Sequence, residues 1–410
     1  MKLEGDNMAN VKRTNRSAVL RNLHENGSTS RKRLSEAVKL TPATISKIVA
    51  DLIEEGLLTT GPVIETGKSV GRREVLVELN AHARCALGIL INIGEARLSA
   101  VWLDGSTAFY ETVSLPRKAP ADETVEMLTK RLMELAEEHH LEREKIIGVG
   151  VAIRGITDTK NRVIRHSFSA LDQEEYPLAE RVEMLTGLPV IMENNVRSLF
   201  LAQMFEARDK SSKSQYFLRC EYGIGASLSL DDKIWRGETG RCSEIGHVPV
   251  IRRGGKPCAC GKSGCLETIA SPSAIREDAI AIMSPTETPV LWNMLKHTKD
   301  EEVSLDAILE AARCGDEKIA QIVDRAVNLL TSTLKTVIYT INPAKIVLYG
   351  QLFENSFYLS RFLAEMEEGL DSEAGRVTIE KSPYNLMLEK KAAGILMVEH
   401  FYELGGIPDE

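Results

Sequence analysis

The sequence lacks any apolar stretch long enough to span a membrane, and its first residues, MKLEGDNMANVKRTNR, contain no apolar signal core. A disulfide framework is also missing, because the seven cysteines are odd in number and scattered along the chain. These absences predict a cytoplasmic protein with reduced thiols. With 410 residues, the chain is long enough for two or three domains that each have a core.

Acidic residues outnumber basic ones in the whole chain, which has a formal net charge of −8. The N-terminal part is the exception. Residues 1–80 hold 13 Lys and Arg against 10 Asp and Glu, a net charge of +3, so the other 330 residues carry −11. A basic segment joined to an acidic body indicates a nucleic-acid-binding module attached to a separate domain.

Three short helical patterns follow one another within residues 14–55. The third has the clearest start, since Thr41 is a suitable N-cap and Pro42 suits the first helical position. Apolar residues then recur at the spacing of one helix face, namely Ile45, Ile48, Val49, Leu52 and Ile53. This pattern predicts a helix with one buried face and one exposed face.

The exposed face of this third helix begins with short side chains and a cation, which suit base edges and phosphates in the major groove: Ala43, Thr44, Ser46 and Lys47. Two alternating strands follow, and the turn between them carries Lys68, Arg72 and Arg73, which we expect to contact phosphate or the minor groove. A helical dimerisation module with solvated charges is the alternative. The run SRKRLSEAVKLTPATISKIVADLIEEGLL resembles the winged helix of bacterial repressors, which favours DNA binding.

From residue 82 onward the pattern changes to strands and helices, and it occurs twice. Each half opens with a hairpin that turns at glycine, CALGILINIGEARLSAVWLD in the first and SQYFLRCEYGIGASLSLDD in the second. Helices are expected at about 121–140, from Asn194, and over 316–341, with buried strands between them. We therefore expect a two-lobed α/β body with a ligand cleft between the lobes.

The run GHVPVIRRGGKPCACGKSGCLE places three cysteines and a histidine close together. His247, Cys258, Cys260 and Cys265 form a Cys₃His set, which suits a tetrahedral, structural Zn²⁺ site with no open position. Glycines within the run let the backbone turn tightly round a small ion. Redox-active thiols are the alternative, which the close spacing of four ligands disfavours.

The longer run GETGRCSEIGHVPVIRRGGKPCACGKSGCLE resembles the signature of the ROK family of repressors, open reading frames and sugar kinases, and specifically its N-acetylglucosamine- and xylose-repressor branch. The resemblance extends from about residue 12 to 400. It implies a two-lobed actin-like, sugar-kinase-like fold behind the winged helix–turn–helix. The predicted domains are 1–80 for the winged helix, 81–200 and 201–385 for the lobes, with a zinc loop at 247–265, and 386–410 for a helix that packs back on the body.

The resemblance also implies a sugar site. Glu244, His247 and Glu267 correspond to the family's contacts with sugar hydroxyls, and Asn194 and Asn195 correspond to an Asn-Asp pair that completes the site. In the family's kinases that Asp is the general base of phosphoryl transfer, a role that the amide of Asn195 cannot perform.

The family's nucleotide-binding loops are altered as well, with changed residues at Asn92, Glu95, Tyr222 and Tyr349. These changes predict a body without catalytic residues or kinase activity. Arg154 adds a charge near the expected cleft, and either an anionic ligand group or a surface salt bridge explains it equally well.

The function predicted from these features is a sugar-responsive transcriptional regulator of carbohydrate genes that acts as a repressor. A homodimer or dimer of dimers would bind a palindromic operator. Two alternatives stay open, a sugar kinase with an accessory DNA-binding head and a regulator that answers to a protein partner.

Overall fold

A computed structural model describes residues 8–64, 74–168, 170–173, 175–207, 213–295, 303–370 and 376–407. The chain forms two compact units, Met1–Asp209 together with Met387–Glu410, and Lys210–Leu386. The sequence analysis put the division of the body at residue 200, which lies inside helix α6 (Asn195–Ala207). The chain therefore passes from the first unit to the second after α6 has ended.

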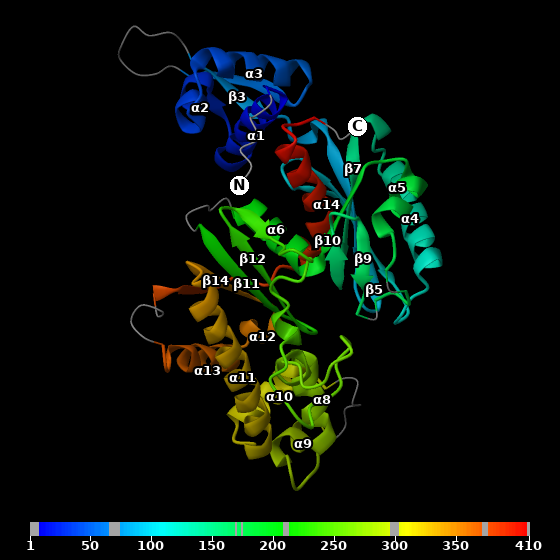
Figure 1. The fold of residues 1–410 in the computed structure, drawn as a ribbon, viewed down its shortest axis with the longest axis vertical. Coiled ribbons are helices and arrows are strands. Elements are labelled where there is room, and N and C mark those ends of the chain that lie inside the picture. The colour runs from blue at the N-terminus through cyan, green and yellow to red at the C-terminus, as the bar shows by residue number, and fades with distance from the viewer. Residues whose placement is uncertain are drawn as a thin grey trace. The chain divides into compact units, whose positions relative to one another are not determined.

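The first unit begins with a small head of helices and strands (Figure 1). Its elements are α1 (Met8–Asn26), β1 (Thr29–Ser30), α2 (Arg31–Val38), α3 (Pro42–Glu54), β2 (Leu58–Ile64) and β3 (Glu74–Leu79). The strands pair antiparallel in the order β1-β3-β2. Ser30 and Thr41 cap α2 and α3, since their hydroxyls accept backbone N–H groups of the first turns. These elements form a helix–turn–helix with a β-hairpin.

The rest of the first unit is built on a five-stranded sheet of order β10-β7-β4-β5-β6. Its strands are β4 (Cys85–Ile91), β5 (Glu95–Trp102), β6 (Thr107–Ser114), β7 (Ile146–Ile153) and β10 (Val190–Asn194). β4, β7 and β10 are parallel, and β5 and β6 continue the sheet antiparallel. The remaining elements are α4 (Ala121–Glu138), β8 (Ile156–Asp158), β9 (Val163–His166), α5 (Leu178–Thr186), α6 and α14 (Leu386–Glu403).

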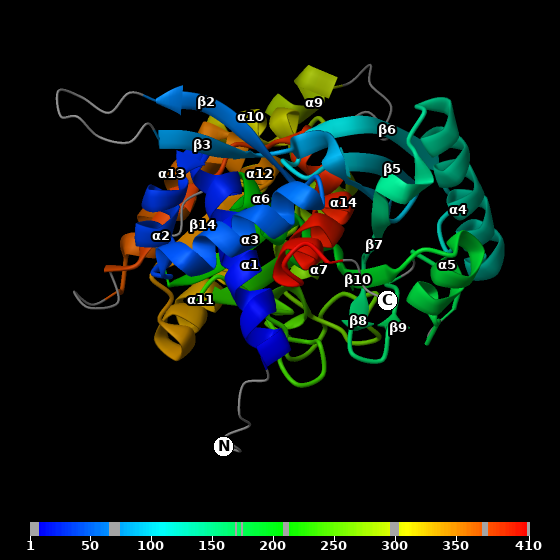
Figure 2. The same ribbon diagram turned by 90° about the horizontal axis from the view of Figure 1, so that it is seen from above.

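Helices cover both faces of this sheet. Figures 1 and 2 show α4 and α5 on one face and α14 on the other. Glycine lets α14 approach closely: a Cβ at Gly88 would lie 2.5 Å from the Gly394 nitrogen, and one at Gly150 would lie 1.9 Å from the Ala393 oxygen. The parallel strands are buried on both faces, which explains why they read as continuous apolar runs.

The second unit repeats this sheet. Its strands are β11 (Ser214–Cys220), β12 (Ile224–Leu230), β13 (Lys233–Trp235), β14 (Lys345–Tyr349) and β15 (Thr378–Lys381), in the order β13-β12-β11-β14-β15. As in the first unit, three antiparallel strands precede two parallel ones. Its helices are α7 (Glu267–Ala270), α8 (Pro272–Ile282), α9 (Pro289–Leu295), α10 (Leu305–Arg313), α11 (Glu317–Ile341), α12 (Gln351–Glu354) and α13 (Ser356–Glu367).

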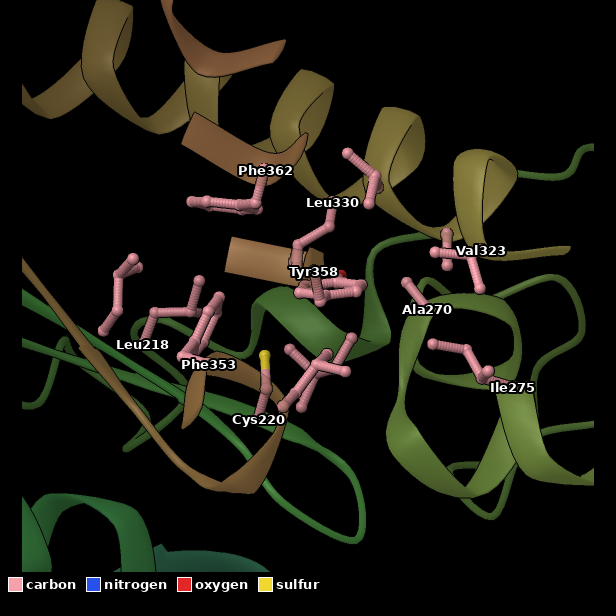
Figure 3. Packing of buried hydrophobic residues seen from close by; sticks show 14 of the residues in the cluster. Leu218, Cys220, Ala270, Ile275, Val323, Leu330, Phe353, Tyr358 and Phe362 are labelled. Carbon is pink, nitrogen blue, oxygen red and sulfur yellow. The ribbon is translucent and has the colours of Figure 1, made fainter. Parts of the chain in front are cut away.

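Buried aliphatic and aromatic side chains fill the core between this sheet and its helices (Figure 3). Phe353 contacts Tyr358 and Phe362 edge to face, with ring centroids 6.2 and 5.3 Å apart. Val323 and Leu330 of α11 belong to the same buried cluster. The long helix is thereby fixed to the sheet.

Among the described residues, none of the helices has both the length and the apolar character required to cross a membrane.

Candidate functional site

The face of α3 that the sequence assigns to DNA is available to solvent. Ala43, Ser46 and Lys47 are exposed, and Thr44 is half-buried. On the other side, four apolar residues of the predicted stripe are buried: Ile45, Ile48, Val49 and Leu52. The Thr44 hydroxyl lies 2.9 Å from that of Thr41, the cap of the helix. Helix α3 thus presents a polar face that its own fold does not use.

The predicted basic wing is described only at its base. β2 and β3 pair as far as Ile64 and Glu74. Lys68, Arg72 and Arg73 lie between Ile64 and Glu74 in the sequence, outside the described residues.

The four predicted metal ligands lie together in the second unit. One ligand atom from each of His247, Cys258, Cys260 and Cys265 lies within 4.8 Å of all the others. Cys260 and Cys265 have their sulfurs 3.6 Å apart, and His247 Nδ1 lies 3.4 Å from the Cys258 sulfur. Bond lengths of about 2.0–2.3 Å in a tetrahedron place such ligand pairs roughly 3.5–3.8 Å apart. The cluster therefore fits a tetrahedral cation of the size of Zn²⁺.

Backbone turns hold these ligands in place. The Cys258 N–H donates to the Lys262 carbonyl at 2.8 Å, and the Gly261 N–H donates to the Cys258 carbonyl at 3.0 Å. Gly264 has a φ of +74°, and a Cβ there would lie 2.1 Å from the Ile251 oxygen, so no other residue fits without a shift. Gly264 is thus required by a close contact as well as by its turn.

The pKa values of the three thiols are shifted in different directions. Burial raises the pKa of the Cys258 thiol to about 12 and raises that of Cys265 as well. At Cys260 burial also raises the pKa, but hydrogen bonds from the Lys262 backbone and from the Cys258 and Cys265 thiols outweigh it, so the pKa is lowered. A divalent cation bound by this cluster would favour the deprotonated form of all three thiols.

Two carboxylates lie beside this cluster, Glu244 next to the histidine ring and Glu267 next to Cys258. With Nδ1 turned toward the cysteines, Nε2 points away and lies 3.9 Å from Glu244 Oε2. Glu267, the first residue of α7, accepts the Ile224 N–H at 3.3 Å and lies 4.0 Å from the Cys258 sulfur. The second unit therefore brings together the three sugar contacts predicted for it, Glu244, His247 and Glu267. A carboxylate behind the histidine also suits a ligating imidazole.

The other two predicted sugar contacts lie where β10 ends and α6 begins, in the first unit. Asn194 caps α6, because its Oδ1 accepts the N–H groups of Val196 and Arg197 at 2.8 and 3.2 Å. Its amide donates to the Gly155 carbonyl at 2.7 Å. Asn195 donates from its amide to Asn92 Oδ1 at 3.1 Å. Asn194 therefore has a structural task of its own, whereas Asn195 is paired with a residue of the first hairpin turn.

Glu95 and Glu221 lie at two of the loops that the resemblance assigns to nucleotide binding, and each is held within its own unit. Glu95 forms an ion pair with Arg97 at 2.6 Å, and Arg97 also pairs with the buried Glu389 at 2.7 Å. Glu221 accepts the Gln351 N–H at 3.0 Å, at the start of α12.

The two altered tyrosines differ in exposure. Tyr222 is half exposed, whereas Tyr349 is buried and donates its hydroxyl to the Asn385 carbonyl at 3.1 Å.

Sequence reasoning missed two buried arginines. Arg197 pairs with Glu193 at 2.6 Å and donates to the Thr157 hydroxyl at 2.8 Å. Arg16 of α1 is also buried. No local signal distinguishes either arginine, because most of the groups that bury and pair them are distant in sequence.

Comparison with known proteins adds independent evidence. Residues 12–59 match a winged helix–turn–helix DNA-binding family, and residues 89–392 match the ROK family. The chain is 27% identical over 350 residues to the DNA-binding transcriptional dual regulator NagC of Escherichia coli, covering 84% of this chain and 82% of NagC. It is 25% identical over 377 residues to the transcriptional repressor Mlc of the same organism, covering 92% and 90%.

A solved ROK family transcriptional regulator, a homologue of the E. coli MLC protein, superposes with a TM-score of 0.80 at 22% identity, covering 97% of this chain and 98% of that one. This likeness confirms the predicted fold, a winged helix–turn–helix followed by the two-lobed α/β body. Since the ROK match alone spans most of the chain, the protein belongs to the ROK family.

Proposed function

We propose that this chain is a sugar-responsive, DNA-binding repressor of carbohydrate genes, and that its ROK body is not a kinase. The single observation that carries the DNA-binding function is the solvent-exposed face of α3, opposite its buried stripe. A helix that packs by one face and offers small polar residues and a lysine on the other can lie in the major groove. The named functions of NagC and Mlc, both DNA-binding regulators, support the same conclusion.

Selection of duplexes from a random library by the purified full-length chain tests this function. We expect enrichment of a palindromic sequence, because a homodimer or dimer of dimers presents equivalent heads to two half-sites. Removing the Lys47 charge by Lys47→Ala should weaken binding to selected and shuffled duplexes alike, and should reduce the salt slope by about 1. Lys130→Ala, on exposed helix α4 of the body, is the matched control. Enrichment of no sequence would refute the function.

The Cys₃His cluster is proposed to hold structural zinc through His247, Cys258, Cys260 and Cys265. The metal, when bound, supplies a four-coordinate cross-link of the loop and no open coordination position for catalysis. The protein's own contribution is to orient the histidine, so that Nε2 faces Glu244 while Nδ1 faces the thiols. Metal analysis of the purified protein should give one zinc per chain.

The ligand of the body is proposed to be a sugar whose hydroxyls donate to Glu244 and Glu267. Carboxylates are strong acceptors for such groups, and the backbone of Ile224 and the ring of His247 hold these two in place. Asn194 and Asn195 belong to the same proposal as contacts from the first unit. Thermal unfolding against neutral, amino, acidic and phosphorylated sugars tests it, since a hundredfold excess over Kd stabilises by about 2.7 kcal/mol. No shift with any sugar at millimolar concentration would refute sugar binding.

The absence of kinase activity is proposed from the residues at the nucleotide loops. Asn195 is an amide and cannot take a proton from an attacking hydroxyl. Glu95 and Glu221 bring negative charge to two of the loops, and each is already bound by its own unit. A coupled assay of ADP release with a panel of hexoses should show no turnover above background. Sugar-dependent ADP release would favour the kinase instead.

A further inference from the structure

Arg16 of α1 joins two segments of the first unit that are far apart in the sequence. Its side chain is almost completely buried, with 1% of its surface exposed. Burying a guanidinium is costly unless its donors are satisfied, so the partners of this side chain indicate what it does.

The partners of Arg16 lie just beyond the C-terminal ends of two different helices. Arg16 Nε donates to the Gly405 carbonyl, just beyond α14, at 2.7 Å. Nη1 donates to Glu55 Oε1 at 2.7 Å, and Nη2 pairs with the other oxygen of the same carboxylate. Glu55 is the residue that ends α3, the helix proposed to read DNA. One planar group therefore connects the C-terminal ends of α3 and α14.

The chain after α14 is shaped for this contact. Gly405 and Gly406 have φ angles of +72° and +80°, which L side chains rarely adopt. A Cβ at Gly405 would lie 2.9 Å from the Arg16 Cβ, and one at Gly406 would lie 2.8 Å from Leu57. The double glycine lets the carbonyl of residue 405 reach the buried Arg16 guanidinium of α1.

Helix α14 is held at its other end as well. It starts where the chain returns from the second unit, at the boundary between Leu386 and Met387. Near this start the buried Glu389 pairs with Arg97, which also binds Glu95 beside the first hairpin turn. Helix α14 thus extends from the unit boundary and the loop of Glu95 to the contact with Arg16.

We propose that Arg16 is a positioning residue for DNA recognition: it fixes the orientation of α3 relative to the ROK body by binding Glu55 and the Gly405 carbonyl together. The inference rests on the proposed DNA-binding function. Two heads on a palindrome must match the spacing and rotation of its half-sites, so a fixed α3 makes binding sensitive to that spacing. Movement of α14 at the unit boundary would be transmitted to α3 through the same side chain.

A second arginine of the same interface provides the control. Arg21 of α1 pairs with Glu399 of α14 at 2.5 Å, with Glu403 3.8 Å away. Both of these partners belong to α14. Within the described part of the chain, Arg21 forms no ion pair with a residue of α3. Loss of Arg21 therefore weakens the joint between head and body without touching the recognition helix.

The test compares Arg16→Lys, Glu55→Gln and the control Arg21→Gln with the wild type, all as full-length chains. The probes are the duplex enriched by the wild type and versions with one or two base pairs inserted between its half-sites. The wild type should lose roughly tenfold or more in affinity on insertion of two base pairs. Arg16→Lys and Glu55→Gln should lose less than about threefold, because a lysine cannot bind both partners and a neutral glutamine weakens the pair.

Wild-type spacing sensitivity in Arg16→Lys and Glu55→Gln would overturn the proposal. Equal loss of sensitivity in Arg21→Gln would also overturn it, because the whole interface and not Arg16 would then set the orientation. Enrichment of no sequence by the wild type refutes the proposed function instead. In that case hydrogen exchange decides: faster exchange in Glu55→Gln at the last turn of α3 and at residues 404–406 supports the joint, and unchanged exchange overturns it.

Discussion

The two units share one sheet design but support the residues at its loops by different means. In the first unit the end of β10 is held by amide side chains, with Asn194 as a helix cap and Asn195 bonded to Asn92. In the second unit a cluster of one histidine and three cysteines holds the loop that carries Glu244 and precedes Glu267.

Both units also bind a glutamate of their first hairpin, Glu95 through an arginine and Glu221 through a backbone N–H. The sheet order is the same in each. Loops and not strands therefore decide what each unit can bind, as is general for folds that host several functions. If each unit depends on its own kind of support, loss of one support should leave the other unit unchanged.

The largest effect is expected from the loss of the metal cluster. Cys258→Ser, or treatment with a strong chelator, should destabilise the second unit by about 4 kcal/mol or more, because a structural metal is bound only by the folded loop. Thermal unfolding should show a lowered transition for this unit and an unchanged one for the first. The exposed Cys314 lies outside the cluster, so Cys314→Ser is the control. If both transitions were lowered equally, the second unit would not depend on its cluster independently of the first unit.

The next effect concerns the contact between α14 and the first sheet. Gly150→Ala places a Cβ 1.9 Å from the Ala393 oxygen, and we expect a loss of about 1–3 kcal/mol in the first unit from the forced shift. Gly94→Ala, at a turn with open space and a φ of +82°, should cost roughly 1 kcal/mol. Denaturant unfolding of both variants measures the difference. A smaller loss at Gly150 than at Gly94 would mean that α14 is not tightly packed.

A smaller effect is expected at the cap of α6. Asn194→Ala removes the acceptor of two N–H groups and should cost about 1–2 kcal/mol, whereas Asn194→Ser keeps a capping oxygen and should recover part of that loss. The transition of the second unit should not move in either variant. If Asn194→Ser recovered neither the stability nor the ligand affinity lost in Asn194→Ala, the amide would have a role beyond capping.

The smallest effect is expected from Asn195→Asp. This change places a carboxylate where the family resemblance puts the general base, but Glu95 and Glu221 remain at the loops that the same resemblance assigns to nucleotide binding. We therefore expect ADP release to stay at the background of the wild type in the coupled assay. Turnover by this single variant would show that Asn195 alone separates the chain from the family's kinases.

Much of the fold could be predicted because its signals are local. The stripe from Ile45 to Leu52, the cap at Thr41 and the proline after it predict α3, and these residues lie where expected. The Cys₃His spacing identified the residues that cluster, since the three cysteines occupy one tight loop. Short-range patterns such as these depend on turns and helix periodicity, which the surrounding structure does not change.

Contacts between distant segments could not be predicted in this way. Arg16 and Arg197 read as ordinary helix-surface arginines, yet each is 1% exposed. Gly405 reads as a helix terminator, whereas its carbonyl is a ligand of Arg16. Burial of a charged side chain depends on which helices pack together, and a single sequence contains no local record of that packing.

The sequence by itself determined the helix–turn–helix, the two halves that each open with a hairpin, and the residues of the Cys₃His cluster, because caps, periodicity and ligand spacing act over a few residues. Only the tertiary structure decided that Glu221 binds the start of α12, that Arg97 pairs with Glu389, and that α3 and α14 meet at one arginine. Those contacts join groups 130 to 389 residues apart in the chain, where packing and not local propensity selects the partner.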